Sequence, residues 1–562
     1  LVPACSITDA PRFEYRGFML DMSRNFHTEQ ELRTLIEAMA LYKLNKLHLH
    51  LSDDEGWRLE IRPLPELTQL GGIQCYDPSE TRCLMPELGG VPQGSPKFLT
   101  AAQYSALLDL ASSRHVTIIP EIDMPGHARA AIKSMELRMA RYPSSQDMRL
   151  TEASDTSRYL SNQMFNDNAL NPCLASVWNF VKVVMDELIR LHREAGQPLA
   201  TFHFGGDEVA AGAWVNSTSC QLLRESGQLP EDSVKAYLMQ VGQGLGGEGE
   251  GERAERGHEV SQSPVESITG YAWSDVWDWG MTSRTHSLAN AGYKVIMAPA
   301  SHVFFDHPQE PDPVEGGNVW AARYIDAFKT FSFMPFSYYD NAQTRLSGKA
   351  ISKEFICKAD NSGCPELKYP ENVIGMKGVL KSLMIKSVEQ FEGQAFPRLL
   401  ALAERAWHAA PWEAVLDPVR RQEELVADWA RFANSLGQGD LALLDAMGVT
   451  YRVPPPGVRR DQDRLLTNVE FPGLKVQFRV EGVPDSAWLD LTPDIKFDAD
   501  RTVLLRTVSP DGRRVSREVK VTTASSSGDN NSRDGTVGLS GSRSTVLVIV
   551  SVLVVMVTVL TI

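Results

Sequence analysis

Short apolar runs alternate with amphipathic stretches over most of this chain. The runs that predict strands cover residues 13–23, 46–51, 116–122, 201–204, 268–272, 294–298 and 372–376. A strand followed repeatedly by a helix predicts a parallel sheet, and eight such units close into a barrel. We therefore predict an α/β fold with a (β/α)8 TIM barrel, whose active site lies at the carboxyl ends of the strands.

Only seven strands are predicted in this way. The gap falls at residues 241–267, which are rich in glycine and glutamate and show no hydrophobic period. Such a composition is typical of a low-complexity, solvated insertion. We predict that the fifth strand of the barrel is degenerate or missing at this place.

The composition changes after the barrel, which is expected to cover residues 13–410. Residues 411–448 predict a helical connection, and residues 449–523 predict a small antiparallel domain that resembles a β-sandwich. Its alternating runs cover residues 474–480, 487–491, 501–508 and 515–521.

The last residues predict attachment to a membrane. Residues 524–543 form a polar stalk, and residues 544–562 are apolar and carry no charge. About 18 or more such residues can cross a bilayer. Small residues, a polar spacer and an apolar tail also resemble the signal for a glycolipid (GPI) anchor. Both alternatives, a GPI anchor or a C-terminal membrane helix, place the protein on the extracellular face of a membrane or in a secretory or lysosomal lumen.

The cysteines indicate an oxidising compartment. Seven are present, and none of the close pairs has the CxxC spacing of a zinc site. Disulfides are therefore expected. The candidates are Cys75 with Cys83, Cys173 with Cys220, and Cys357 with Cys364. Asn216 and Asn530 lie in glycosylation sequons.

The charge balance excludes one large class of partner. With 56 basic and 71 acidic residues the chain carries a net charge of −15. Nothing here would neutralise nucleic-acid phosphates in bulk, so nucleic acid is not an expected partner.

The motif HFGGDEV, residues 203–209, follows a predicted strand directly. Its two glycines allow a sharp turn, after which Asp207 and Glu208 face the mouth of the barrel. Adjacent carboxylates repel each other, so one tends to keep its proton near neutrality and can act as an acid.

Other strand ends supply matching groups. Arg24 follows the first strand, Asp53 follows the second, and Asp123 with His127 follows the third. Trp273 comes just past a later strand, and its flat apolar face suits a sugar ring. Each residue alone has a structural explanation, but together they predict one site at one end of the barrel.

Several long motifs identify a family. RGFMLDMSR, KLNKLHLHLSDDEGWRLEI, IPEIDMPGH, HFGGDE, AWSDVWDWG and FPRLLALAERAW occur in order along the chain. They closely resemble glycoside hydrolase family 20, the β-N-acetylhexosaminidases, over about residues 9–410. The domain after Tyr451 resembles the C-terminal module of the chitobiase-like branch. Residues 1–12 would then be the end of an upstream α/β domain.

The resemblance implies an exo-β-N-acetylhexosaminidase that releases terminal β-linked GlcNAc or GalNAc from glycans or chitooligosaccharides. Glu208 matches the general acid/base, and Asp207 matches the carboxylate that orients the acetamido group of the substrate. The acetamido oxygen attacks the anomeric carbon, which gives an oxazolinium intermediate and net retention. No cofactor and no metal is expected.

The remaining roles also follow from the resemblance. Arg24 matches the residue that holds O3 and O4 of the terminal sugar, Asp306 matches a ligand of its outer hydroxyls, and Trp273 matches a wall of the acetamido pocket. Asp53 and His127 match a relay that supports the proton on Glu208. Asp123 is placed in the same substrate-binding set. The expected partners are the glycan and the membrane, with a homodimer as one expected assembly.

Three departures favour an alternative function. Phe304, Lys381 and Leu383 stand where the family has a tyrosine, a tryptophan and a glutamate. With the fifth strand in doubt, they favour a catalytically impaired glycan-binding protein on the same barrel. A third hypothesis is a metal-dependent hydrolase, since His48 and His50 lie on one side of a strand. The long family resemblance disfavours it.

Overall fold

The computed structural model describes residues 8–86, 94–229, 253–256, 268–359, 363–461, 463–483, 487–497 and 501–522. The polar stalk, the apolar tail and Asn530 lie outside the described residues, as does most of the 1–12 segment. No helix in the described part of the chain is both long and apolar enough to span a bilayer.

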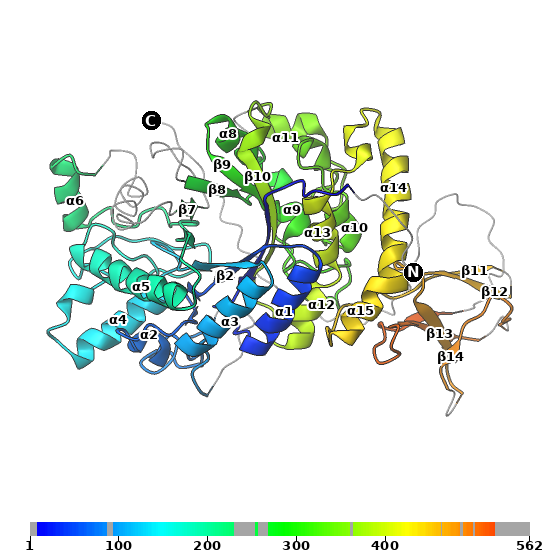
Figure 1. The fold of residues 1–562 in the computed structure, drawn as a ribbon, viewed down its shortest axis with the longest axis horizontal. Helices are drawn as coiled ribbons and strands as arrows, with labels where there is room; N and C mark the ends of the chain where they lie inside the picture. Colours follow the sequence, from blue (N-terminus) through cyan, green and yellow to red (C-terminus); the bar gives the residue numbers. More distant parts are fainter. Residues whose placement is uncertain are drawn as a thin grey trace, which may run out of the picture.

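Eight parallel strands of the described chain form a closed barrel with the order β1-β10-β9-β8-β7-β6-β5-β2 (Figure 1). They are β1 (Tyr15–Asp21), β2 (Lys46–His50), β5 (Thr117–Glu121), β6 (Thr201–His203), β7 (Arg253–Arg256), β8 (Ile268–Ala272), β9 (Lys294–Met297) and β10 (Val373–Leu380). All seven predicted runs form strands of this barrel, which confirms the predicted TIM-barrel-like fold.

The fifth strand was predicted to be degenerate or missing, and strand β7 corrects the second alternative: the strand is present, but short and charged. It lies within residues 241–267 and pairs in parallel with β6 and β8, through Phe202 opposite Ala254 and Ala254 opposite Ile268. Its sequence is RAER. A strand of four residues with three charges has no apolar alternation, so hydrophobic periodicity cannot detect it.

The helices lie around the barrel (Figure 1). They are α1 (Glu29–Leu41), α2 (Glu66–Gln69), α3 (Ala101–Ser113), α4 (Arg129–Arg141), α5 (Ala175–Glu194), α6 (Thr218–Glu225), α8 (Arg284–Asn290), α9 (Ala300–Val303), α10 (Ala327–Phe331), α11 (Lys353–Ala359), α12 (Val388–Ala395) and α13 (Arg398–Trp407). Helix α1 shows why such segments fold locally. Thr28 and Glu31 form a capping box at its start, and Leu32 and Leu35 bury its inner face.

A two-stranded hairpin, β3 (Ser52–Asp53) with β4 (Gly56–Trp57), extends the chain beyond β2. Asp53, in this hairpin, lies 2.7 Å from His50, the last residue of β2.

Helices also occupy the 411–448 segment, as α14 (Pro418–Ser435) and α15 (Leu441–Ala446). Beyond them, β13 (Lys475–Val480), β14 (Leu489–Asp490), β15 (Val503–Val508) and β16 (Val519–Val521) form an antiparallel sheet with the order β14-β13-β15-β16. The hairpin β11 (Gly457–Asp461) and β12 (Arg464–Asn468) was not predicted, because Arg459, Arg460, Asp461 and Arg464 interrupt its apolar pattern. Figure 1 shows this domain, in orange, beside α14.

Candidate active site

A cavity of about 890 Å³ lies at the carboxyl ends of the barrel strands. Six of the eight predicted site residues line it: Arg24, His127, Asp207, Glu208, Trp273 and Asp306. Asp53 and Asp123 are buried directly behind these residues. The barrel therefore brings side chains from distant parts of the sequence to one place.

The loop after β6 is shaped by its glycines. Gly205 and Gly206 have φ of +67° and +89°, values that favour glycine. A Cβ on Gly205 would overlap Oδ1 of Asp123, so a side chain cannot be accommodated there. This tight turn carries Asp207 and Glu208 to the cavity surface.

Asp123 supports the loop from beneath. Its Oδ1 accepts a hydrogen bond from the backbone N–H of Gly206 at 3.2 Å. Burial, together with the nearby Asp207 carboxylate, raises the pKa of Asp123 well above its ordinary value. Asp123 therefore holds its proton more tightly than an ordinary aspartate. It contacts the backbone of the loop and is not among the residues that line the cavity.

A chain of contacts runs from Glu208 into the protein. Glu208 Oε2 lies 3.4 Å from His127 Nε2. On the other side of the ring, His127 Nδ1 lies 3.0 Å from Asp53 Oδ1. Asp53 Oδ2 in turn lies 2.5 Å from Arg24 Nη1 and 2.7 Å from His50 Nε2. The four groups hold one another in fixed positions behind Glu208.

The pKa shifts show where the proton rests in this chain. Burial lowers the pKa of His127, but the Asp53 carboxylate outweighs it and leaves that pKa well above its ordinary value. Burial raises the pKa of Glu208, but the hydrogen bond and charge of His127 outweigh it and lower that pKa. These opposite shifts favour the form in which His127 carries the proton and Glu208 is ionised.

A second buried cluster, which the sequence did not predict, lies deeper in the barrel. Glu121 Oε2 lies 2.6 Å from His50 Nδ1 and 2.9 Å from His48 Nε2, and its Oε1 lies 2.7 Å from His203 Nδ1. Lys377 Nζ lies 2.8 Å from His48 Nδ1. The alternation along the predicted strand 46–51 indicates only that His48 and His50 lie on the same side of that strand.

This cluster bears on the metal-dependent hypothesis. Donor atoms of His48, Glu121 and His203 lie close enough together to hold a metal ion. However, the ammonium of Lys377 contacts His48, and the carboxylate of Glu121 already faces three imidazoles. A nearby ammonium repels a metal cation, so this donor set does not fit a metal ion well.

Aromatic rings and one carboxylate form the opposite wall of the cavity. Asp306 Oδ2 accepts hydrogen bonds from Trp320 Nε1 at 3.3 Å and Asn318 Nδ2 at 3.4 Å. The ring of Trp320 lies 6.0 Å from that of Trp273. Trp320 was missed because it follows no predicted strand. Flat rings beside a fixed carboxylate suit a sugar ring with hydroxyl groups.

The three departures from the family pattern all line the cavity. Phe304 is buried and packs 5.2 Å from the ring of Trp320, so no hydroxyl donor is present at its position. Lys381 and Leu383 follow the end of β10.

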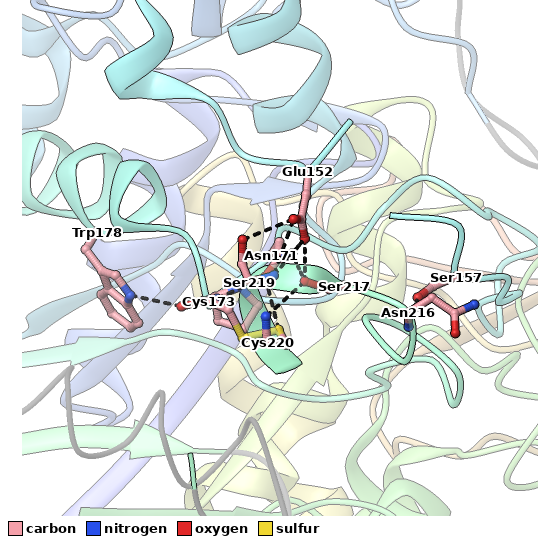
Figure 2. Close-up of a disulfide and its surroundings, with 10 residues drawn as sticks. Glu152, Ser157, Asn171, Cys173, Trp178, Asn216, Ser217, Ser219 and Cys220 are labelled. Atoms are coloured by element: carbon pink, nitrogen blue, oxygen red, sulfur yellow. Dashed lines mark hydrogen bonds between the residues drawn. A yellow bond between two sulfur atoms is a disulfide. The ribbon is translucent and has the colours of Figure 1, made fainter. Parts of the chain in front are cut away.

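The predicted disulfides are confirmed: Cys75–Cys83, Cys173–Cys220 and Cys357–Cys364. Cys173–Cys220 ties α6 to the residues before α5, and so anchors the far end of the loop that carries Glu208. Figure 2 shows Glu152 beside this disulfide, where it accepts hydrogen bonds from Ser217 Oγ at 2.5 Å and Ser219 Oγ at 3.1 Å. Asn216, in its sequon, is exposed on the same loop.

Residues 13–410 match the catalytic domain of glycosyl hydrolase family 20, and residues 440–518 match the chitobiase/beta-hexosaminidase C-terminal domain. The chain belongs to glycosyl hydrolase family 20. Membership places Asp207 and Glu208 in the family's catalytic domain and agrees with the resemblance of the motifs.

Family 20 relatives match over most of this chain. A beta-hexosaminidase from Vibrio vulnificus is 35% identical over 90% of this chain and 63% of that protein. N,N'-diacetylchitobiase from Vibrio harveyi is 36% identical over 92% of this chain and 64% of that protein. The chain therefore spans less than two thirds of the length of either relative.

A solved family 20 structure also matches. The GH20 exo beta-N-acetylglucosaminidase from Vibrio harveyi, in complex with N-acetylglucosamine, superposes with a TM-score of 0.60 and 30% identity. The match covers 79% of this chain and 60% of that one.

Proposed function

We propose that this protein is an exo-β-N-acetylhexosaminidase that releases terminal β-linked GlcNAc or GalNAc from glycans or chitooligosaccharides. One observation carries the proposal: Asp207 and Glu208 stand together in the cavity, and a histidine with its own carboxylate partner backs Glu208. Family membership supports the same conclusion.

The proposed mechanism uses the substrate's own acetamido group. Asp207 orients that group, and its carbonyl oxygen attacks the anomeric carbon while the bond to the leaving oxygen breaks. Glu208, after taking the proton from His127, donates it to the leaving oxygen. Water then attacks the anomeric carbon, the bond between that carbon and the acetamido oxygen breaks, and Glu208 accepts the proton from that water. Two inversions give net retention.

The alternative of a catalytically impaired glycan-binding protein has lost one of its supports, because β7 completes the barrel. Phe304, Lys381 and Leu383 remain. They remove a hydroxyl donor, an aromatic ring and a carboxylate from the sugar site, and leave Asp207, Glu208 and His127 in place. We therefore expect a slower enzyme, because loss of one donor to a developing charge costs about 3 kcal/mol.

Hydrolysis of a chromogenic β-N-acetylglucosaminide tests the proposal. The anomeric form of the first product is read by proton NMR. Initial release of the β-anomer supports the proposed mechanism. Initial release of the α-anomer, or no release in a folded protein, would contradict it.

We also propose that residues 544–562 tether the protein to a membrane on the extracellular or lumenal side, through a GPI anchor or a C-terminal helix. The uncharged apolar sequence supports the tether, and three disulfides support an oxidising compartment. Treating intact cells with a phosphatidylinositol-specific phospholipase separates the alternatives. Release indicates the anchor, retention in the membrane indicates the helix, and absence from the membrane fraction contradicts both.

A further inference from the structure

Glu121, the last residue of β5, is a buried carboxylate that the proposed function does not use. Its Oε2 lies 2.6 Å from His50 Nδ1, and its Oε1 lies 2.7 Å from His203 Nδ1. His50 contacts the chain of groups behind Glu208, and His203 directly precedes the loop that carries Glu208. Glu121 therefore touches both supports of the general acid.

His50 has a carboxylate at each of its ring nitrogens. Its Nδ1 faces Glu121 Oε2 at 2.6 Å, and its Nε2 faces Asp53 Oδ2 at 2.7 Å. All three side chains are buried. A neutral imidazole has one N–H and can donate to only one of the two carboxylates, whereas an imidazolium donates to both. The geometry therefore favours a positively charged His50.

The pKa shifts of these three groups agree with that charge. Burial lowers the pKa of His50, but the carboxylates of Glu121 and Asp53 outweigh it and raise that pKa. Burial raises the pKa values of Glu121 and Asp53, but the basic groups around each outweigh it and leave both pKa values well below the ordinary ones. The three groups thus form a buried cluster of two carboxylates and one imidazolium.

Other titratable and charged groups face this cluster from the neighbouring elements. They are Asp21 and Arg24 at and after the end of β1, His48 on β2, His203 on β6, Lys377 on β10 and Lys381 just after β10. Burial, together with Lys377, holds the pKa of His48 well below its ordinary value, and burial lowers the pKa of His203. These shifts favour the neutral forms of both, so His50 is the histidine of this group that carries the charge.

The charge on His50 acts on His127 through the carboxylate that they share. Asp53 Oδ2 contacts His50, and Asp53 Oδ1 lies 3.0 Å from His127 Nδ1. The carboxyl groups that face His127 are those of Asp53, Asp54, Asp123 and Glu208. Two cations on one carboxylate repel each other, so a charged His50 loosens the hold of Asp53 on the proton of His127. A proton that is held less tightly passes more readily to Glu208.

We propose that Glu121 is a positioning residue for the general acid. It keeps His50 positively charged, and this charge sets how tightly the pair of Asp53 and His127 holds the proton that the general acid needs. The inference rests on the proposed function. A merely structural role, in which Glu121 only braces His203 and the loop after it, predicts no change in the proton affinity of His127.

Glu121→Gln removes the charge and keeps the shape of the side chain. His50 should then lose its proton near neutral pH, and Asp53 should hold the proton on His127 more tightly. Glu121 reaches Asp53 through His50, so the lost charge of His50 dominates at His127. The basic limb of the kcat profile should move to higher pH by about half a unit or more, and kcat at pH 7 should fall by about tenfold, with KM little changed. A limb that stays in place or moves to lower pH would overturn the proposal.

Further variants assign the effect to this route. His50→Gln removes the same positive charge directly, so it should move the limb in the same direction, and Glu121→Gln should add little to it. Glu66→Gln is the matched control, because Glu66 is also buried and pairs with a cation, Arg138 at 2.8 Å, but does not line the cavity. Its pH profile should be unchanged. Additive shifts from Glu121→Gln and His50→Gln would show that the effect does not pass through His50. If Glu121→Gln does not fold, an unmoved limb in His50→Gln overturns the proposal.

NMR keeps this inference separate from the proposed function. With ¹⁵N in the histidine rings, the signals of His50 and His127 are assigned by their loss in His50→Gln and His127→Gln. Both ring nitrogens of His50 should be protonated in the wild type from about pH 5 to 8. Glu121→Gln should leave one of them unprotonated and raise the pKa of His127, and this result would support the inference even if no hydrolysis is found. A neutral His50 in an active wild-type enzyme would overturn the inference and leave the function intact.

Discussion

Nε2 of His127 lies 3.4 Å from Oε2 of Glu208, and the pKa of the histidine is raised while that of the glutamate is lowered. A general acid must hold a proton when the leaving group departs. In the proposed mechanism, the imidazole holds the proton and passes it to Glu208 across this contact. The Asp53 carboxylate is what keeps it there.

Asp53→Asn tests this proton store. Removing the carboxylate lowers the pKa of His127, because burial then acts without a compensating charge. The basic limb of the kcat profile should move to lower pH by about one to three units. The profile is measured between pH 4 and 9. An unchanged limb, with kcat reduced equally at every pH, would show that Asp53 only supports the structure.

The raised pKa of His127 also predicts the direction in which stability changes with pH. His127 has a folded-state pKa well above the ordinary value of 6.5. The stability that protonated His127 gives to the folded protein is therefore fully present below about pH 6.5, and it is lost as the pH rises through the raised pKa. Thermal unfolding of the wild-type protein and His127→Gln should differ most at pH 6 and progressively less at higher pH. A difference that grows with pH would contradict the assignment.

Asp123→Asn should stabilise the protein at neutral pH. An acid with a raised folded-state pKa loses its proton more readily when unfolded, so stability falls as the pH rises above 3.8. Asparagine keeps a side-chain oxygen that can accept the hydrogen bond from the N–H of Gly206, and it has no carboxyl proton to lose. The melting temperature should exceed that of the wild type at pH 7 and approach it at pH 4. A lower melting temperature at pH 7 would show that Asp123 is ionised.

Replacing Cys173 and Cys220 by serine should reduce both stability and activity. The disulfide spans 47 residues, so loop entropy predicts a loss of about 4 kcal/mol, and the loop that carries Glu208 loses its anchor. The Cys357/Cys364 pair, with a separation of 7, is the matched control, with a loss of about 2 to 3 kcal/mol and unchanged activity. Urea unfolding measures the stability of each variant, and kcat/KM measures its activity. Full activity in the Cys173/Cys220 variant would contradict the anchoring role.

The sequence predicts the site residues that follow strands with a clear hydrophobic pattern, because a barrel brings the carboxyl ends of all its strands together. Arg24, His127 and Glu208 are of this kind. It does not predict contacts made only through space, such as those of Glu121 with His203 and of Lys377 with His48. Hydrophobic periodicity also cannot reveal β7, whose residues are mostly charged. The chemistry at the surface of the cavity was therefore predictable, whereas the buried charges that tune it were not.

Asp207 should be nearly as important as Glu208. Asp207→Asn removes the charge that orients the acetamido group, so kcat should fall by about 10² to 10³. Inhibition by a thiazoline that mimics the cyclised intermediate should weaken in parallel, because the inhibitor resembles the transition state. Inhibition that is unchanged in Asp207→Asn would mean that the acetamido group does not take part.

The most direct test of the account is kcat/KM of wild type and Glu208→Gln on one chromogenic β-N-acetylglucosaminide. The glutamine has the same shape and cannot transfer the proton. We predict measurable wild-type hydrolysis and a loss of about 10² to 10⁴ in the variant, with an unchanged melting profile. Equal rates for the two folded proteins, or no hydrolysis by the wild type, would contradict the central claim.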